Sequence, residues 1–215
     1  MADPTLILYG NTGWSSPYVF SSFVALEEKK LPFEMRELDL EKQQTFEPAY
    51  RDASLTARVP ALVHGDFWLS ESSAIDEYLE DAFPPPRFTA IYPSGTRERA
   101  RARQLQAWVR SDLMALREER PTTVIFQRQR PEPFTREGAA AAERLLRVVD
   151  RILPSGATSI FPTFTIVDAD LSLMLHRLIA GGDPVPERIR TYAEAVWNRP
   201  SVRKFVDHPR PHAGH

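Results

Sequence analysis

The sequence predicts an α/β domain followed by an all-helical domain, and three observations support this fold class. Short apolar runs with strand character alternate with helical patterns over the first 83 residues. A proline-rich break at 83–86 then ends the last helix of this part. Beyond residue 95 every apolar pattern has helical spacing. We therefore expect a first domain at 1–83, a linker at 84–95, a helical domain at 96–207 and a tail at 208–215.

The first domain is predicted to begin with a strand, a helix and a second strand. Residues 5–9 are a continuous apolar run that ends in a Gly-Asn turn, which indicates a buried strand. Ser16 is the natural N-cap of the next helix, because Pro17 is well suited to be its first residue. The chain returns as a second strand at 33–40 and then passes through a poorly patterned, irregular stretch at 52–58.

The rest of the first domain is predicted to be a strand pair and a helix. A short β-branched strand at 58–63 is entered through Pro60, and a Gly-Asp turn leads into a strand at 67–69. Hydroxyl and carboxylate side chains at 70–73 then indicate a helix start. The backbone beside Pro60 can pair with an extended ligand, and the positive helix end can take a carboxylate. We interpret this stretch as the binding site of a small peptide.

The second domain contains only helical patterns. The predicted helical segments lie at 105–116, 142–153, 171–179 and 189–197, with a last short turn at 201–206. The segment at 105–116 is apolar around most of its circumference, as expected for a helix that is buried on several sides.

Composition excludes several classes of function. A hydrophobic content of 42% with 26% charged residues is ordinary for a soluble globular protein. The formal charge of −2 gives no reason to expect nucleic acid or anionic lipid as a partner. No apolar run approaches the roughly 20 residues of a membrane span, and no signal peptide is visible. We expect a cytoplasmic protein without a membrane partner.

The chain contains no cysteine, which excludes disulfides, thiolate metal sites and a cysteine nucleophile. Any thiol chemistry must therefore use the thiol of a ligand. The five histidines form no metal-binding pattern, because His64 and His176 stand alone and the others lie in the proline-rich tail, at 208, 212 and 215. No metal site is expected.

Four short motifs occur in order along the chain: Trp-Ser-Ser-Pro-Tyr at 14–18, Arg-Val-Pro at 58–60, Glu-Ser at 71–72 and Thr-Ile-Val-Asp at 165–168. They resemble motifs of the soluble glutathione S-transferases, in which a thioredoxin-like N-terminal domain precedes a helical domain. In the family these positions carry the Ser-Pro active-site segment, the Val-Pro element, the glutamate-serine pair and the N-capping box. The resemblance covers almost the whole chain, and the Ser-Pro-Tyr start is similar to a bacterial serine-type group.

The resemblance implies how glutathione, as co-substrate, would bind. Pro60 would follow a cis peptide bond, and the backbone of Val59 would pair with the cysteinyl backbone of glutathione. Glu71 would bind the γ-glutamyl ammonium, while Ser72 and the helix N-terminus would take the γ-glutamyl carboxylate. The alternative is that Pro60 only enters a strand and that the acidic and hydroxyl residues only cap a helix.

Ser16 is the candidate catalytic residue. A free thiol with a pKa of about 8.5 is only about 3% ionised at pH 7, and lowering that pKa by about two units requires roughly 2.7 kcal/mol. A hydroxyl hydrogen bond and the dipole of the helix that begins at Pro17 have the right size. The rivals are Ser15 and Tyr9, since tyrosine-type members place a phenol near the end of the first strand. Ser16 acting only as a helix cap is the other alternative.

Other residues have expected roles in the helical domain. Thr165 and Asp168 are expected to be a structural N-cap, although Phe-Pro-Thr-Phe replaces the glycine that usually precedes the box in the family. Trp108 and Asp112 lie four residues apart on one helix face and would line a second-substrate pocket with Trp14, although core packing explains Trp108 equally well. The arginine run at 97–103 is expected to be a solvated or subunit-pairing face.

The resemblance implies a homodimeric glutathione transferase with a role in detoxification. Its thiolate would attack a small hydrophobic electrophile, and reduction of peroxides is a close variant. One alternative is a non-catalytic binding or scaffold protein of the same fold. Another is a glutathione-dependent isomerase, although the Ser-Ser-Cys-Ser signature of that group is absent.

Overall fold

The computed structural model describes residues 6–210 and divides the chain into two compact units. Unit 1 comprises residues up to Ile91 together with those from Asp207 onward, and unit 2 comprises Tyr92–Val206. Residues 84–91 of the predicted linker and the first residues of the predicted tail therefore belong to unit 1. The rest of the predicted tail, at 211–215, lies outside the described residues, as does the start of the first predicted strand.

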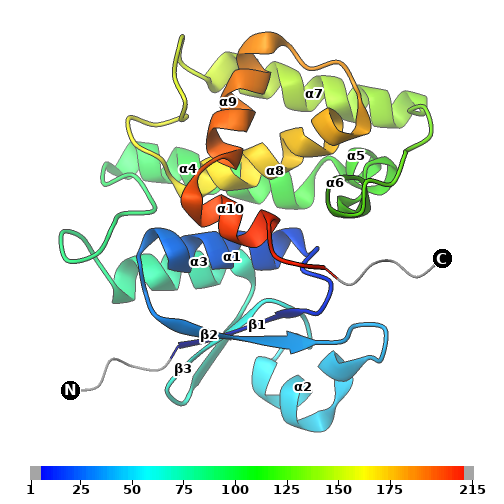
Figure 1. Cartoon of the computed structure of the whole chain (residues 1–215). Helices are drawn as coiled ribbons and strands as arrows, with labels where there is room; N and C mark the ends of the chain where they lie inside the picture. Colours follow the sequence, from blue (N-terminus) through cyan, green and yellow to red (C-terminus); the bar gives the residue numbers. More distant parts are fainter. Residues whose placement is uncertain (1–5, 211–215) are drawn as a thin grey trace. The chain divides into compact units, whose positions relative to one another are not determined.

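Unit 1 is a four-stranded mixed sheet with helices, as predicted. The sheet order is β2-β1-β3-β4, with β1 parallel to β2 and antiparallel to β3, and β3 antiparallel to β4. Figure 1 shows α1 and α3 together on one face of this sheet. The elements are β1 (Leu6–Asn11), α1 (Pro17–Glu28), β2 (Phe33–Leu38), η1 (Gln44–Phe46), α2 (Pro48–Ser54), β3 (Ala61–His64), β4 (Phe67–Ser70) and α3 (Ser72–Ala82).

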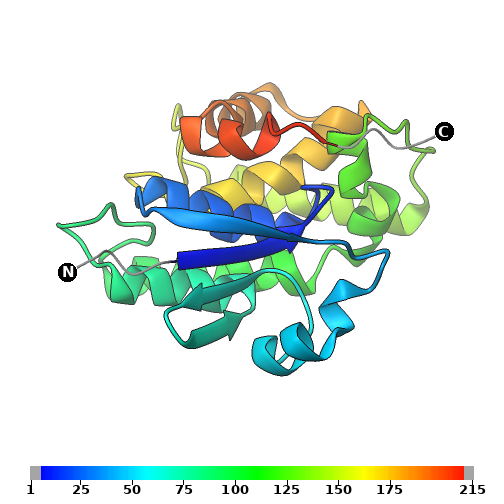
Figure 2. The same ribbon diagram turned by 60° about the horizontal axis from the view of Figure 1, so that its bottom comes forward.

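The stretch expected to be irregular at 52–58 contains the end of a helix, α2, so that expectation was wrong in part. Figure 2 follows the chain from β2 into α2. Pro48 occupies the start of α2, a favourable position for proline. Only Tyr50 and Ser54 are buried in this helix, so it carries no apolar stripe that sequence periodicity could detect.

The core of unit 1 lies between the sheet and the pair α1 and α3. Leu8 and Leu62 are register partners on β1 and β3, and both are fully buried. Gly10 lets α1 approach closely, because a Cβ atom there would lie 2.3 Å from Met35 Cε and 2.8 Å from Val19 Cγ1. This close contact fixes α1 against the end of β1.

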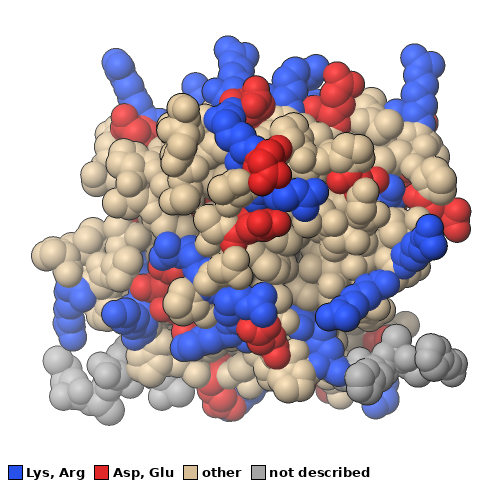
Figure 3. Space-filling view, turned by 45° about the horizontal axis from the view of Figure 1, so that its top comes forward, with Lys and Arg blue, Asp and Glu red and all other residues tan. Residues whose placement is uncertain are grey.

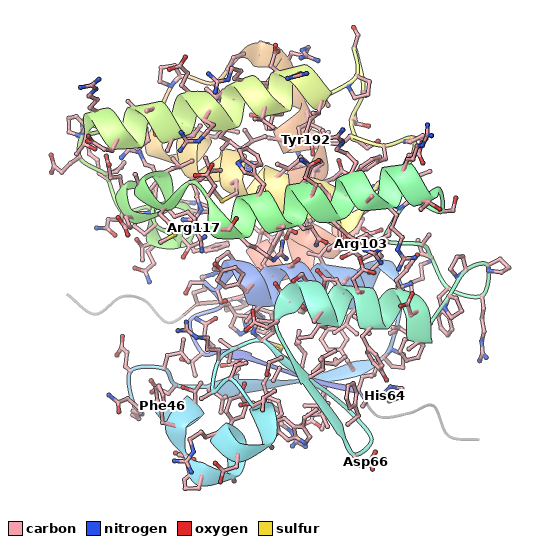
Figure 4. The ribbon with its side chains drawn as sticks, turned by 180° about the vertical axis from the view of Figure 1, so that it is seen from behind. Phe46, His64, Asp66, Arg103, Arg117 and Tyr192 are labelled. Carbon is pink, nitrogen blue, oxygen red and sulfur yellow. The ribbon has the colours of Figure 1, made fainter. Side chains whose placement is uncertain are left out.

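Unit 2 is entirely helical over its described residues, as predicted. The helices are α4 (Thr96–Ser111), α5 (Met114–Glu119), α6 (Thr122–Phe126), α7 (Arg136–Ile152), α8 (Ile166–Gly181), α9 (Glu187–Trp197) and α10 (Pro200–Val206). Most of α8 is buried, and α8 and α9 pack against each other. Figure 4 shows Tyr192 of α9 inside this bundle, where its hydroxyl donates to Asp168 of α8 at 2.9 Å.

The predicted helix at 105–116 is two helices in the structure. Helix α4 ends at Ser111, and Leu113 has a φ of 63°, so the backbone turns before α5 begins at Met114. The expectation of burial on several sides is also wrong for α4, because its buried residues, Ala102, Leu105, Gln106 and Val109, recur every three or four positions and form one face. Apolar residues continue on both sides of this turn, so the sequence pattern did not indicate that the helix ends there.

Charged side chains of both signs are interspersed on the surface, as Figure 3 shows for one face. In the arginine run of α4, Arg97, Arg101 and Arg103 are exposed, whereas the guanidinium of Arg99 lies 5.4 Å from the centre of the Tyr92 ring. Among the helices of residues 6–210, none has the combination of length and apolar character needed to cross a bilayer.

Candidate functional site

Three segments of unit 1 meet at one edge of the sheet because of the strand register. Tyr9 near the end of β1 pairs with Ala61 at the start of β3, and Ala61 pairs with Ser70 at the end of β4. The loop after β1, the residues before β3 and the start of α3 therefore leave the sheet at the same edge. These are the segments that contain Ser16, Val59-Pro60 and Glu71-Ser72, so the register brings the predicted site residues together.

Asn11 organises the loop at 11–16, here called the Ser16 loop. Its side-chain amide donates to Ser15 Oγ at 3.1 Å, and its amide oxygen accepts from the Ser16 backbone N–H at 3.2 Å. Its carbonyl accepts from the Trp14 N–H at 3.0 Å. Asn11 was not singled out from the sequence, where the Gly-Asn pair only signals a turn.

Ser16 is the N-cap of α1. Its hydroxyl oxygen accepts from the Val19 N–H at 3.3 Å, and Pro17 is the first helical residue. The first turn of α1 contains no acidic side chain, so no carboxylate there neutralises the positive end of the helix dipole or competes with a bound anion. Capping uses an acceptor site of the hydroxyl and leaves its proton able to donate to an anion. Capping and thiolate binding are therefore compatible roles for Ser16.

The two rivals of Ser16 have other surroundings. The hydroxyl of Ser15 accepts the Asn11 hydrogen bond. Tyr9 alternates with Leu8 along β1, so it faces away from the core that contains Leu8. The Tyr9 ring stacks on Trp68 at 5.1 Å, and its hydroxyl accepts from Arg36 at 3.2 Å. Tyr9 thus belongs to an aromatic cluster on the sheet face opposite α1.

The Val59–Pro60 peptide bond is cis in the structure. Pro60 is buried and Val59 is half-buried. The residue before them is tied to α2, because the Tyr50 hydroxyl donates to the Arg58 carbonyl at 2.7 Å. Burial raises the pKa of Tyr50, which keeps its proton in place for this bond. Helix α2 therefore anchors the backbone just before the cis peptide bond.

Glu71 and Ser72 begin α3 at the same edge. Glu71 is exposed and has a φ of 70° and a ψ of 111°, a backbone conformation that non-glycine residues rarely adopt outside functional sites. Its carbonyl accepts the Ile75 N–H at 2.9 Å, and Ser72 is the buried first residue of the helix. The Glu71 side chain is thus at the surface beside a helix N-terminus.

The residues of the expected second-substrate pocket belong to both units. Trp14 lies in unit 1, whereas Trp108 and Asp112 lie in unit 2, so the pocket that they would share stays a prediction. Asp112 accepts hydrogen bonds from the Leu113 N–H at 2.6 Å and from Trp108 Nε1 at 3.0 Å. These bonds and the Arg144 guanidinium hold the pKa of Asp112 below its usual range. The carboxylate therefore has a structural task where α4 ends.

Thr165 and Asp168 form the N-capping box of α8. Asp168 accepts from the Thr165 N–H at 2.8 Å and from the Ile160 N–H at 2.8 Å. Burial raises the pKa of Asp168, although these hydrogen bonds act in the opposite direction. Its acceptor capacity is used for the loop before α8 and for Tyr192. Within residues 6–210 no group of acidic or histidine side chains could hold a metal ion.

Comparisons with known proteins match both units. A family model for the C-terminal domain of glutathione S-transferases matches residues 96–209, and one for the N-terminal domain matches residues 15–82. A solved glutathione transferase homologue from Burkholderia GL BGR1, with bound glutathione, is 42% identical with a TM-score of 0.79. That alignment covers 94% of this chain and 97% of the Burkholderia chain.

Curated relatives are similar over shorter stretches. Human glutathione S-transferase theta-1 is 35% identical over 91 residues, which are 42% of this chain and 37% of the human protein. A probable maleylacetoacetate isomerase from Vibrio cholerae is 29% identical over 111 residues, 51% of this chain and 49% of the relative. The chain thus spans less than half the length of these two relatives.

Proposed function

The chain belongs to the glutathione S-transferase family, and from that membership we propose that it activates the thiol of glutathione for attack on a hydrophobic electrophile. The observation that supports this most strongly is the convergence of Ser16, the cis Val59–Pro60 peptide and Glu71 at one edge of the sheet. The solved Burkholderia homologue contains bound glutathione, which supports the same ligand for this chain.

In the proposed complex the tripeptide lies along this edge in an extended conformation. The backbone of Val59 pairs with the cysteinyl backbone, and Pro60 holds that backbone in place. The exposed carboxylate of Glu71 binds the γ-glutamyl ammonium, and Ser72 with the N-terminus of α3 binds the γ-glutamyl carboxylate. These assignments use two of the three segments that the strand register brings together, and the third contains Ser16.

Ser16 would donate its hydroxyl proton to the sulfur of bound glutathione. The donor and the positive end of α1 both favour the thiolate over the neutral thiol, which lowers the pKa of the bound thiol. The thiol proton leaves to solvent, and the sulfur forms a bond to the electrophilic carbon while the leaving group departs with the bonding electrons. Reduction of a peroxide by the same thiolate is a variant of this reaction.

Substitution of Ser16 tests this proposal. Ser16→Ala should lower turnover of glutathione with an aryl halide by about 10- to 100-fold, because a hydrogen bond to the charged thiolate, which is worth about 1.5 to 3 kcal/mol, is lost. The affinity for glutathione, measured by calorimetry, should change little, since Ser16 contacts only the sulfur. Unchanged turnover in this variant would transfer the role to Ser15 or Tyr9, which Ser15→Ala and Tyr9→Phe would reveal.

A matched variant separates catalysis from capping. Alanine at an N-cap destabilises a helix by about 1 kcal/mol, whereas glycine does so by only a few tenths. Ser16→Gly should therefore unfold close to the wild-type temperature and still lose turnover as Ser16→Ala does. If Ser16→Gly kept wild-type turnover, the hydroxyl would have only a capping role.

A glutathione-dependent isomerase is the second candidate, favoured by the likeness to the probable maleylacetoacetate isomerase of Vibrio cholerae. Faster cis–trans isomerisation of a maleyl compound than conjugation of any aryl halide would support it. A scaffold without catalysis is the third candidate and predicts no glutathione binding. We further propose a cytoplasmic homodimer, and a monomeric mass by light scattering would contradict the dimer.

A further inference from the structure

The C-terminal segment at 207–210 contacts the Ser16 loop within unit 1. The Arg210 guanidinium donates twice to the Trp14 carbonyl, from Nε at 3.2 Å and from Nη2 at 3.0 Å. Its Nη1 donates to the His208 carbonyl at 3.0 Å, which fixes the shape of the segment itself. The His208 ring stacks on the Trp14 indole with 3.6 Å between centroids and 16° between planes. Both the backbone and the ring of Trp14 are thus held by the segment at 207–210.

Trp14 has an unusual conformation for a bulky residue. Its φ is 46°, in the left-handed region that side chains with a Cβ atom rarely adopt. Its indole N–H donates to Glu37 at 2.8 Å, and its ring meets the edge of Phe23 at 5.5 Å. Contacts from β2, from α1 and from the segment at 207–210 therefore converge on Trp14. Such convergence is needed to keep an unfavourable backbone conformation populated.

The geometry of Trp14 determines where Ser16 lies. The Trp14 carbonyl belongs to the peptide group that leads into Ser15, one residue before Ser16. Arg210 binds this peptide group through its carbonyl, while the Asn11 side chain binds Ser15 Oγ and the Ser16 N–H. Rotation of the Trp14–Ser15 peptide would move Ser15 relative to Asn11 and disturb the two hydrogen bonds that place Ser15 and the Ser16 N–H.

We propose that Arg210 and His208 are positioning residues for Ser16, so that the segment at 207–210 sets the geometry of the thiolate site. The inference rests on the proposed function and goes beyond it, because neither residue needs to touch glutathione. Arg210 acts on the peptide group and His208 on the ring of the same residue. Burial lowers the pKa of both side chains, in keeping with their enclosed position against Trp14.

The first experiment measures the loop itself in the full chain without ligand. Amide hydrogen exchange of the peptide that covers the Ser16 loop should become faster in Arg210→Ala than in the wild type. The matched control is Arg147→Ala, which removes an exposed arginine of α7. Equal exchange of the loop in Arg210→Ala and in the wild type would overturn the proposal.

The second experiment measures the bound thiol. In Arg210→Ala the turnover at pH 7 should fall about tenfold, since a misplaced catalytic group loses at least that much. The apparent pKa of the pH–rate profile should rise by about one unit, which from about 6.5 lowers the thiolate fraction at pH 7 about threefold, and the misplaced sulfur accounts for the rest of the loss. The affinity for glutathione should change less than twofold. A merely structural tail would lower thermal stability without shifting that pKa.

Conservative variants complete the test. Arg210→Lys retains one donor and should recover part of the turnover, while His208→Phe keeps the stacking and should behave almost as the wild type. His208→Ala should resemble Arg210→Ala. An unchanged pH–rate profile in both alanine variants would overturn the positioning role even if their loops exchange faster. If the wild type does not use glutathione, the proposed function fails. Amide hydrogen exchange of the Ser16 loop then still tests whether the segment at 207–210 holds this loop.

Discussion

Asn11 holds the Ser16 loop through both ends of its side-chain amide. One end donates to Ser15 and the other accepts from the Ser16 N–H. Asn11 is 7% exposed, so water cannot easily replace these partners. The Ser16 hydroxyl is placed by this residue from within the loop, in addition to its own cap on Val19.

Asn11→Ala should therefore weaken catalysis more than binding. The loss of two hydrogen bonds destabilises the loop by roughly 1 kcal/mol each, and the Ser16 hydroxyl is then less well placed. Turnover should fall while the calorimetric affinity for glutathione stays within a few-fold of the wild type. Asn198→Ala at the exposed end of α9 is the matched control and should leave turnover unchanged.

Some site residues are visible in the sequence and others are not. Ser16 and Pro17 are recognisable because N-caps and first-turn prolines are local signals. Pro60 and Glu71 are recognisable from local sequence. Their proximity depends on the pairing of Ala61 with Ser70, a contact between strands that cannot be read from local sequence. Arg210 lies 196 positions from Trp14, and no local rule connects such a pair.

His176 makes the stability of unit 2 dependent on pH. Its ring stacks on Trp197 at 3.9 Å, and its Nδ1–H donates to the Ser172 carbonyl at 2.9 Å. Burial lowers the pKa of His176 from 6.5 to about 4. The unfolded chain binds the proton first as the pH falls, so the folded state loses stability between pH 6.5 and 4 and gains none above.

His176→Gln should reduce this pH dependence. A shift of this size corresponds to roughly 2 to 3 kcal/mol between pH 8 and pH 4.5. The free energy of unfolding, measured in urea at both values, should therefore fall by about that much less in the variant than in the wild type. Carboxylates titrate in both proteins and cancel in the difference. An equal fall in both proteins would contradict the role of His176.

At the scale of elements, α1 and α3 are joined by polar as well as apolar contacts. Asp76 of α3 is fully buried and accepts from the hydroxyls of Ser21 at 3.0 Å and Ser22 at 3.2 Å, both in α1. The two helices begin at Ser16 and Glu71, at the edge where the site lies. Their mutual packing therefore holds the two helix N-termini of the site in a fixed relation.

Lys29, just after α1, connects this helix to α3 and to the chain beyond it. Its side chain is fully buried and pairs with Glu80 of α3 at 2.6 Å. It also donates to the carbonyls of Phe83 at 2.9 Å and Thr89 at 3.0 Å. Glu80 in turn accepts the Ile91 N–H at 3.1 Å. These contacts tie residues 83–91 to α1 and α3, in keeping with their place in unit 1.

Lys29→Met should destabilise unit 1 strongly, because it leaves Glu80 buried without its counter-charge. The loss is expected to be about 3 to 5 kcal/mol in the free energy of unfolding. The double variant Lys29→Met with Glu80→Gln should recover part of that loss. Lys30→Met changes the neighbouring exposed lysine and should have little effect. Equal stability of Lys29→Met and Lys30→Met would show that the buried Lys29–Glu80 pair is not required.

The helices that sequence reasoning missed share a physical cause. Helices α5 and α6 span 114–119 and 122–126, too short for a 3.6-residue period to repeat, and α2 is nearly as short. In contrast, α8 was recognised as a long apolar helix that is buried almost throughout, and α9 because its buried positions recur at helical spacing. The turn at Leu113 depends on the Asp112 carboxylate bonding its N–H, a local contact that apolar periodicity does not reveal.

For the whole molecule, the division into two units makes a specific prediction about ligand binding. Ser16, Val59, Pro60, Glu71 and Ser72 all belong to unit 1. A ligand that binds only the native state stabilises the part of the protein that forms its site. Glutathione should therefore act directly on unit 1 and on unit 2 only as far as the two unfold together.

Glutathione at about 100 times its dissociation constant adds about 2.7 kcal/mol, which raises the melting temperature by roughly 5 to 10 °C for a chain of this size. Calorimetric scans should show this shift in Ser16→Ala as well, because Ser16 contacts only the sulfur, and should lose most of it in Glu71→Ala. One shifted transition means that the units unfold together, whereas a shift in only one of two transitions means that unit 1 unfolds by itself. No shift at millimolar glutathione in the wild type would favour a scaffold protein over a transferase.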